Sequence, residues 1–290
     1  MAPAAGLQRQ LIHAQNPDGG WGYRSGSSWT EPTALAVLAL ESQGVKDAVY
    51  QRGCRWLLSN QKPDGGWPPH PAVDTSTWVT SLCTLALSGD LLCGPREDHA
   101  IEWLLRQIKP PTDPVARLVY RLRGLSAPRQ TGGSPWFPGT AAWIYPSAFS
   151  ILALSRTARM RNRPQLRAHA RQAQRYILSH RCRDGGWNHG GSPYLSDDAF
   201  SYPEITGLAL LALYGVPEPE VALPLKLAEA HLASVSSLEA FCWLRLALIR
   251  HGRNQDEVGR GLPCRTTRDL SLQLLACAET PDNRLLSAFD

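Results

Sequence analysis

Apolar and polar residues follow one another along the chain in blocks that indicate two kinds of helix. Helices of the first kind are almost wholly apolar, which is typical of a helix buried on every side. Their apolar runs occupy residues 33–40, 80–87, 147–154, 206–213, 241–248 and 271–277. Helices of the second kind are amphipathic and are expected at 6–14, 50–59, 99–108, 164–179 and 219–232, with an extra one at 114–125. No alternating β-branched run occurs, so we predict no strands.

A short motif lies between the amphipathic and the apolar helix of a pair. It reads Asn-Pro-Asp-Gly-Gly-Trp at 16–21, Lys-Pro-Asp-Gly-Gly-Trp at 62–67 and Arg-Asp-Gly-Gly-Trp at 183–187, and we assign a weaker copy to 134–139. Paired glycines permit a tight turn, the aspartate can accept hydrogen bonds from nearby amides, and the tryptophan can bury a large area. Repetition at this scale predicts one supersecondary unit stacked on copies of itself.

The stretches at 15–21 and 60–67 resemble the QW repeats of squalene–hopene cyclases. Class II terpenoid cyclases and protein prenyltransferase β subunits share this repeat. The resemblance covers nearly the whole chain, strongly to Gly215, and implies an all-α fold. It implies a single α/α toroid over 1–290, in which about six inner and six outer helices surround an apolar, aromatic-lined cavity. Such a fold supports several activities, so function must be argued from the site.

Alignment of the six apolar helices on their carboxyl ends predicts a ring of residues at one mouth of the toroid. The residues nine positions before those ends are Glu31, Trp78, Tyr145, Glu204, Glu239 and Arg268. Carboxyl groups in apolar surroundings can act as general acids, and aromatic faces can stabilise a cation. Glu204, Glu31 and Glu239 are therefore candidate acids. A second interpretation is structural, because Ser28, Ser201 and Ser236 precede these glutamates at the spacing of a helix-capping box.

Other candidates come from the flanking loops. The Asp-x-Asp-Asp motif of class II cyclases is absent at the matching helix start, where residues 202–206 read Tyr-Pro-Glu-Ile-Thr. The nearest acidic pair, Asp197 and Asp198, lies between aromatic residues and provides two further candidate acids. The candidate substrate-binding residues are Trp29, Trp78, Trp143, Tyr145 and Tyr202.

Cofactor motifs do not appear in the sequence. The Asp-x-Cys pair that holds zinc in the prenyltransferase branch is missing, and so is any Gly-x-Gly-x-x-Gly or P-loop motif. We therefore predict no metal and no other cofactor.

Composition and charge indicate the compartment of the protein and the surfaces that it can contact. Seven cysteines without regular spacing do not suggest disulfides, and no secretory signal or long apolar span is found, so we expect a cytoplasmic protein that can act at a membrane surface. The net charge is +5, and arginines at 163, 167, 171 and 175 share one helix face. That face is either a solvated outer surface or a stripe for anionic head groups. Nucleic-acid binding is not expected.

The sequence leads to two functional hypotheses. The first is an acid-initiated cyclisation or isomerisation of a linear polyprenyl or triterpenoid substrate. The second is non-catalytic binding of an isoprenoid or lipid, or a role as a partner-dependent subunit. In the cyclases that the chain resembles, the active site lies between two barrels. The sequence predicts only one barrel here, so we expect a second subunit, a second copy of the chain or a membrane surface to cover its mouth.

Overall fold

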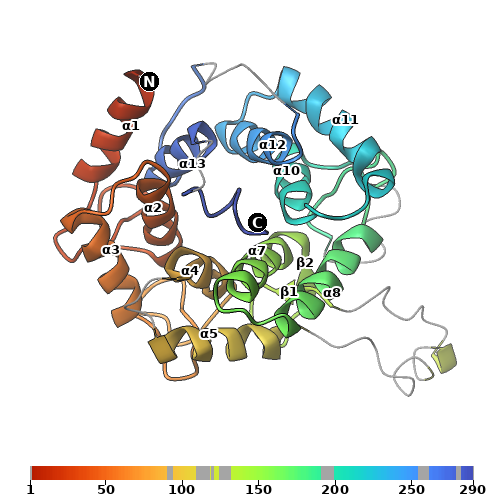
Figure 1. The fold of residues 1–290 in the computed structure, drawn as a ribbon, viewed down its shortest axis with the longest axis horizontal. Helices are drawn as coiled ribbons and strands as arrows, with labels where there is room; N and C mark the ends of the chain where they lie inside the picture. Colours follow the sequence, from red (N-terminus) through yellow and green to blue (C-terminus); the bar gives the residue numbers. More distant parts are fainter. Residues whose placement is uncertain are drawn as a thin grey trace.

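The computed structural model describes residues 2–89, 94–108, 118, 121–123, 132–190, 199–253, 261–278 and 282–289. In these residues two concentric rings of helices surround a common axis (Figure 1). The inner helices are α2 (Thr30–Ser42), α4 (Val79–Leu87), α7 (Ile144–Met160), α10 (Pro203–Ala212), α12 (Leu238–Arg250) and α13 (Thr267–Cys277). The outer helices are α1 (Ala2–His13), α3 (Ala48–Ser59), α5 (Gly94–Gln107), α8 (Gln165–Ser179) and α11 (Glu218–Ser234). The predicted all-α toroid is confirmed, whereas the extra helix predicted at 114–125 lies almost entirely outside the described residues.

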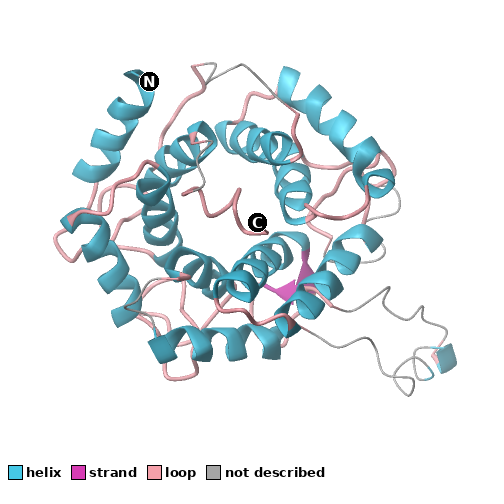
Figure 2. Ribbon diagram, viewed as in Figure 1, coloured by secondary structure: helices cyan, strands magenta, loops and turns pink. Residues whose placement is uncertain are grey.

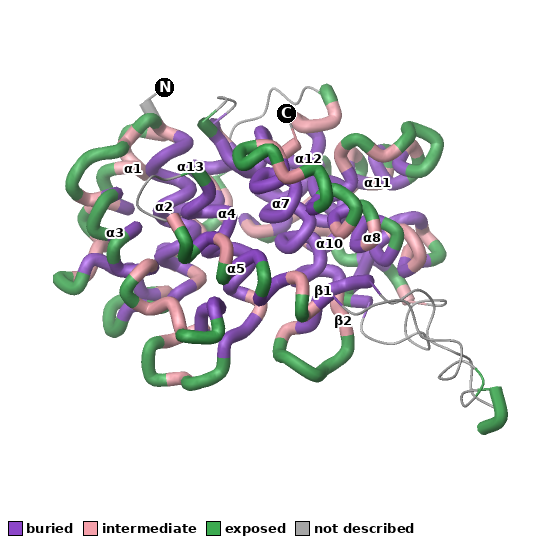
Figure 3. The backbone as a smooth tube through the Cα atoms, turned by 60° about the horizontal axis from the view of Figure 1, so that its bottom comes forward, coloured by how far each residue is buried: buried purple, intermediate pink, exposed green. Residues whose placement is uncertain are grey.

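The inner helices form a closed ring because each packs on the next and the last returns to the first. The order is α2, α4, α7, α10, α12 and α13, and α13 then packs on α2. Every residue of α4 is buried, as expected for an apolar helix with neighbours on all sides. Exposed residues gather on the outer helices and on the loops (Figure 3).

Helix α8 shows how an outer helix divides its two faces. It buries Leu166, Ala170, Ala173 and Ile177. The arginines at 167, 171 and 175 are exposed on the opposite face. Arg163 forms an ion pair of 2.9 Å with Asp98 of α5. None of the described helices is long and apolar enough to cross a membrane.

The tryptophan of each intact turn connects an outer helix to an inner helix. Trp21, Trp67 and Trp187 are at most 1% exposed. Their indole N–H groups donate to the carbonyls ten residues earlier, which are those of Leu11 (2.8 Å), Leu57 (2.7 Å) and Ile177 (2.7 Å). Their backbone N–H groups donate to the hydroxyls of Thr33 (2.9 Å), Thr80 (2.9 Å) and Thr206 (3.0 Å). Each tryptophan therefore satisfies one polar group at the end of the outer helix and one in the inner helix.

The two glycines of the turn serve different purposes. Gly19 has a φ of 94°, a conformation that other residues rarely adopt. Gly20 has an ordinary conformation, but a Cβ there would lie 2.6 Å from the Cβ of Ser28. The second glycine is therefore required by the close approach of the segment that leads into α2.

The turn aspartates tie this segment in place. Asp18 accepts hydrogen bonds from the Gly20 amide (3.0 Å), the Ser28 hydroxyl (2.7 Å) and the Trp56 indole of α3 (2.9 Å). In the same way, Ser201 donates to Asp184 (2.9 Å). The turn is thereby joined to the next outer helix as well as to the segment that leads into its own inner helix.

These contacts show that the capping-box interpretation of Ser28, Ser201 and Ser236 is wrong. Helices α2 and α10 begin at Thr30 and Pro203, so their N-cap residues are aromatic and make no side-chain cap. The N-cap of α12 is Ser237, one residue after the predicted serine. Ser28 and Ser201 bind the turn aspartates instead.

The third turn has a different register from the predicted one. Ser134 N–H donates to the Ser147 hydroxyl at 2.8 Å, which is the bond that tryptophan N–H groups make to threonines in the intact turns. Gly132, Gly133 and Ser134 thus occupy the Gly-Gly-Trp positions, and Trp136 lies two residues beyond. The chain then reverses and pairs β1 (Ser134–Pro135) with β2 (Ala142–Trp143) in antiparallel fashion. This two-residue ladder corrects the prediction that the chain has no strands.

A C-terminal segment at 282–289, which the sequence did not indicate, ends inside the inner ring (Figures 1 and 2). The Asn283 side chain donates to the carbonyls of Leu275 (2.8 Å) and Ala278 (2.9 Å). Arg284 donates to the Ala86 carbonyl (2.7 Å) and forms an ion pair with Glu41. Because these partners lie at the carboxyl ends of inner helices, the segment occupies the mouth opposite the helix starts.

A matched pair of glycine substitutions tests the role of the turn. We expect Gly20→Ala to lower the free energy of unfolding by about 2 kcal/mol, because the added methyl group meets Ser28. Gly6→Ala is the control, since nothing lies within 4 Å of its added Cβ inside α1. It should be neutral or stabilise by up to about 1 kcal/mol. Urea denaturation measures both, and equal effects would contradict this account of the turn.

The turn aspartates also predict a pH dependence. Burial raises the pKa of Asp18 and Asp184, but hydrogen bonds from Ser28 and Gly20, and from Ser201 and Gly186, outweigh it and hold both pKa values below the ordinary value. The resulting stability is complete above the unfolded pKa of about 4 and is lost as pH falls through the folded pKa.

Unfolding midpoints between pH 7 and pH 3 test this dependence. The stability advantage of the wild type over an Asp18→Asn/Asp184→Asn variant should narrow below about pH 4. A constant difference over this range would contradict the assignment.

Candidate functional site

All six residues of the predicted ring line one cavity, which we call the mouth cavity. It has a volume of about 590 Å³ and lies where the inner helices begin. Its described lining consists of Tyr23, Glu31, Trp78, Trp136, Tyr145, His189, Glu204, Ile205, Glu239, Thr266, Arg268 and Asp269. The first turns of the inner helices converge at this face, so residues distant in sequence meet there.

Arg268 crosses the mouth of the inner ring. From the first turn of α13 its Nε donates to Glu31 of α2 at 2.7 Å, and its Nη2 donates to Glu239 of α12. Nη2 also donates to the Tyr145 hydroxyl at 3.1 Å. Since α7 lies opposite α13 in the ring order, this last bond spans the mouth.

The protonation of this network follows from its contacts. Burial disfavours the charge of Arg268, but Tyr145, Glu239 and Glu31 outweigh it and raise the pKa of the guanidinium. Burial and the neighbouring Glu31 raise the pKa of Tyr23, which stays protonated and donates to that carboxylate. Burial raises the pKa of Tyr145 in the same way.

The structure divides the three candidate glutamates into two kinds. Glu31 and Glu239 are ion-paired with Arg268, with side chains 12% and 30% exposed. Glu204, in the first turn of α10, is half-buried and has no hydrogen bond or ion pair to another described residue. Arg268 thus occupies two of the three ring glutamates. Glu204 is the ring glutamate that no described side chain binds.

Aromatic rings form one wall of the mouth cavity. Trp78 meets Trp136 and Tyr145 edge to face, with centroids 5.1 and 5.2 Å apart, and Trp136 stacks on Tyr145 at 5.3 Å. One turn deeper, Phe149 and Trp243 are fully buried and in ring contact at 5.7 Å. The wall thus continues into the interior of the inner ring.

The other sequence candidates lie outside this lining. Trp29 contacts Tyr23 with ring centroids 5.8 Å apart, and Tyr202 contacts His189 at 5.4 Å. Trp143 also contacts His189, at 6.2 Å. These three residues therefore contact lining residues from outside the lining. Asp197 and Asp198 lie outside the described residues.

Sequence reasoning missed three lining residues that share one position in the repeat. Tyr23, Trp136 and His189 each lie two residues after the tryptophan position of a turn. Their carbonyls accept hydrogen bonds from the starts of preceding inner helices, at Thr267 (2.9 Å), Trp78 (3.1 Å) and Ile144 (2.9 Å). This spacing could have identified them once the turn register was known.

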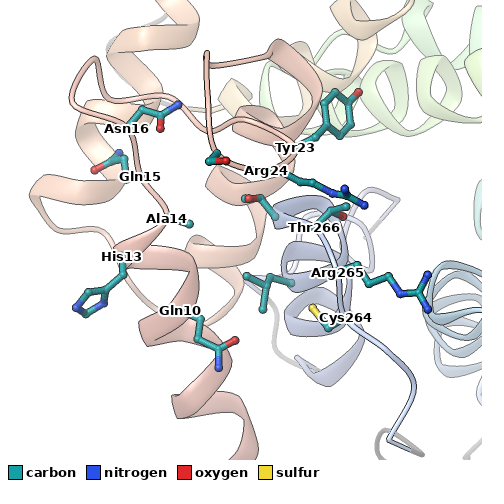
Figure 4. Close-up of a pocket in the computed structure, with 13 residues that line it drawn as sticks. Gln10, His13, Ala14, Gln15, Asn16, Tyr23, Arg24, Cys264, Arg265 and Thr266 are labelled. Carbon is teal, nitrogen blue, oxygen red and sulfur yellow. The ribbon is translucent and has the colours of Figure 1, made fainter.

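A second cavity of about 630 Å³, the side cavity, lies between the end of α1, the first turn and the start of α13 (Figure 4). It shares Tyr23 and Thr266 with the mouth cavity. Its described lining includes Arg24 and Arg265 and contains no aspartate or glutamate. The two neighbouring cavities therefore differ in the sign of their charge. Within the described part of the chain, no three His, Cys, Asp or Glu side chains are grouped as metal ligands.

The fold and the site define an α/α toroid with an acidic, aromatic mouth. Residues 33–220 match the family described as the squalene-hopene cyclase C-terminal domain, and the chain belongs to that family.

Sequence relatives match over a shorter segment. Drimenyl diphosphate synthase of Streptantibioticus cattleyicolor is 40% identical over 65 residues, which are 22% of this chain and 12% of that protein. Alpha-onocerin synthase LCD of Lycopodium clavatum is 34% identical over 65 residues, which are 21% of this chain and 8% of that protein. The matched segment thus spans about an eighth or less of these relatives.

Solved structures show the same fold at low sequence identity. The type II terpene cyclase MstE from Scytonema, in complex with geranylgeranyl dihydroxybenzoate, has a TM-score of 0.55 and 14% identity over 98% of this chain and 82% of that one. An inactive variant of the alpha-1,6-mannanase GH76A of Salegentibacter has a TM-score of 0.63 and 12% identity over 98% of each chain. Because both identities are so low, these likenesses establish the fold alone.

The division of the glutamates predicts unequal effects on stability. Glu31→Gln removes the charge that binds Arg268 and should cost about 2 kcal/mol of unfolding free energy. Glu204→Gln changes a side chain without a described partner and should stay within about 0.5 kcal/mol. Chemical denaturation of both variants measures the difference, and a larger loss for Glu204→Gln would contradict the assigned network.

Proposed function

We propose that the chain carries out a proton-initiated cyclisation or isomerisation of a linear isoprenoid at the mouth cavity. The observation that carries this proposal is the carboxyl of Glu204, which binds no described side chain, in a cavity walled by Trp78, Trp136 and Tyr145. Membership of the squalene-hopene cyclase family supports it. The names of the relatives and the isoprenoid bound to MstE agree with this class of substrate.

In this reaction protonated Glu204 gives its proton to one carbon of a substrate double bond. The π electrons form the new C–H bond, a cation develops on the adjacent carbon, and the carboxylate of Glu204 remains. A second double bond can then attack the cation, which forms a C–C bond and moves the positive charge to another carbon. With or without this ring closure, the reaction ends when a proton leaves a carbon next to the cation to a base, and Glu204 takes up a new proton from solvent. The aromatic faces stabilise the cation electrostatically. Arg268 holds Glu31 and Glu239 in position.

The same proposal includes a second molecule or a membrane surface that covers the mouth cavity. Large apolar side chains are exposed where the inner helices begin: Trp29 (36%), Phe137 (51%), Phe200 (81%) and Tyr202 (46%). Exposed apolar groups of this kind often mark a contact surface, and a carbocation reaction requires water to be excluded. A second subunit, a second copy of the chain or a membrane surface would supply the cover.

Product analysis tests the catalytic proposal. The protein is incubated with squalene, farnesyl diphosphate or geranylgeranyl diphosphate, with and without lipid vesicles and a chelator, and the extracts are analysed by mass spectrometry. We expect a cyclic or isomerised product that survives chelation, and we expect Glu204→Gln to reduce its rate at least about a hundredfold.

Glu102→Gln, on the exposed face of α5, is the control and should retain the wild-type rate. Undiminished turnover by Glu204→Gln would contradict the assigned acid. The lack of any product under all these conditions would contradict the proposed reaction.

A further inference from the structure

We infer that the mouth cavity selects ligands by charge, accepting an isoprenoid with a cationic or uncharged head group and rejecting one with a diphosphate. The carboxyl groups of the lining set this selectivity, and Arg268 limits it by neutralising Glu31 and Glu239. The inference rests on the proposed function only in taking the mouth cavity as the ligand site. It concerns binding and does not require turnover.

Acidic groups outnumber basic groups in the lining. The described lining holds four carboxyl groups, those of Glu31, Glu204, Glu239 and Asp269, and one guanidinium, that of Arg268. The formal charge is −3 with Glu204 ionised and −2 with Glu204 protonated. Asp269 accepts hydrogen bonds from the amides of Arg265 (2.9 Å) and Thr266 (3.0 Å). A diphosphate in this cavity would meet a net repulsion, whereas an ammonium group would be attracted.

Arg268 is poorly available to an anionic ligand. Its Nε and Nη2 atoms already donate to Glu31, Glu239 and Tyr145, and its side chain is only 15% exposed. A phosphate that took these donors would leave two partly buried carboxylates without their cation, which is strongly unfavourable. The guanidinium therefore neutralises Glu31 and Glu239 and does not attract a phosphate into the cavity.

The aromatic wall adds to the same preference. Trp78, Trp136 and Tyr145 line the cavity beside the carboxylates, and the faces of such rings attract cations. The side cavity carries the opposite charge through Arg24 and Arg265, both of which are exposed. It could bind a diphosphate independently, so a test of the mouth cavity must first remove these two charges.

Three ligands with one hydrocarbon chain and different head groups test the inference. Farnesyl dimethylamine, farnesol and farnesyl diphosphate are titrated into an Arg24→Gln/Arg265→Gln background, and binding is followed by calorimetry. We expect the amine to bind at least about tenfold more tightly than the diphosphate, with farnesol between them, and the ratio to shrink as salt is added. Equal or tighter binding of the diphosphate, or binding of none of the three ligands, would overturn the inference.

Variants of Arg268 separate its charge from a purely structural role. In the same background, Arg268→Gln should increase the ratio of amine to diphosphate affinity several-fold, and Arg268→Lys should return it toward the starting value. Circular dichroism checks that each variant is folded. If Arg268 had a structural role alone, its substitution would lower the affinity for all three ligands together and leave the ratio of amine to diphosphate affinity unchanged. That result would contradict the inference.

Glu204→Gln tests whether the carboxyl groups of the lining cause the preference for the amine. It should lower the amine preference, while the control Glu102→Gln should not change it. A protein that keeps the predicted order of binding but shows no turnover supports this inference and counts against the proposed reaction alone. A protein that turns over substrate yet binds the diphosphate as tightly as the amine contradicts this inference alone.

Discussion

The hydrogen bonds of the turn tryptophans are the interaction on which the rest of the structure depends. Each indole N–H reaches a carbonyl at the end of an outer helix, while the backbone N–H of the same residue reaches a hydroxyl on the inner helix. Both partners are buried, so an alternative geometry would leave polar groups unsatisfied. The bonds therefore fix how each inner helix starts relative to its outer helix, and their repetition brings the first turns of the inner helices to one face.

The end of the chain closes the ring without this motif. Helix α13 has no Gly-Gly-Trp turn before it, and ion pairs and hydrogen bonds hold it in the ring instead. Arg268 ties its start to Glu31 and Glu239, while the Gln43 side chain donates to the Leu274 carbonyl near its end at 3.1 Å. The C-terminal segment then covers the opposite mouth through Asn283 and Arg284. The mouth cavity thus lies where ring closure and candidate chemistry use the same residues.

Much of the fold was predictable because the signals are local and repeated. The apolar runs located the inner helices, and their alignment correctly predicted that Glu31, Glu204 and Glu239 lie together at one mouth. The division of these glutamates was not predictable, because it depends on Arg268 of α13, which binds the glutamates of the two neighbouring helices α2 and α12. The third turn was misplaced because the sequence favoured Trp136, although hydrogen bonding places Ser134 at that position. The Ser-x-x-Glu spacing predicts helix caps at Ser28 and Ser201, but it cannot show that an aspartate ten or more residues earlier accepts their hydroxyl groups.

The central claim is that the mouth cavity delivers a proton to a carbon atom of an isoprenoid. Turnover in deuterium oxide tests it most directly, because a proton added to carbon from an exchangeable acid is replaced by deuterium. The account predicts that each product molecule gains one non-exchangeable deuterium at the carbon that was protonated, as measured by mass spectrometry and deuterium NMR. A cyclised or isomerised product with no deuterium would contradict it, because the reaction would then start without the acid.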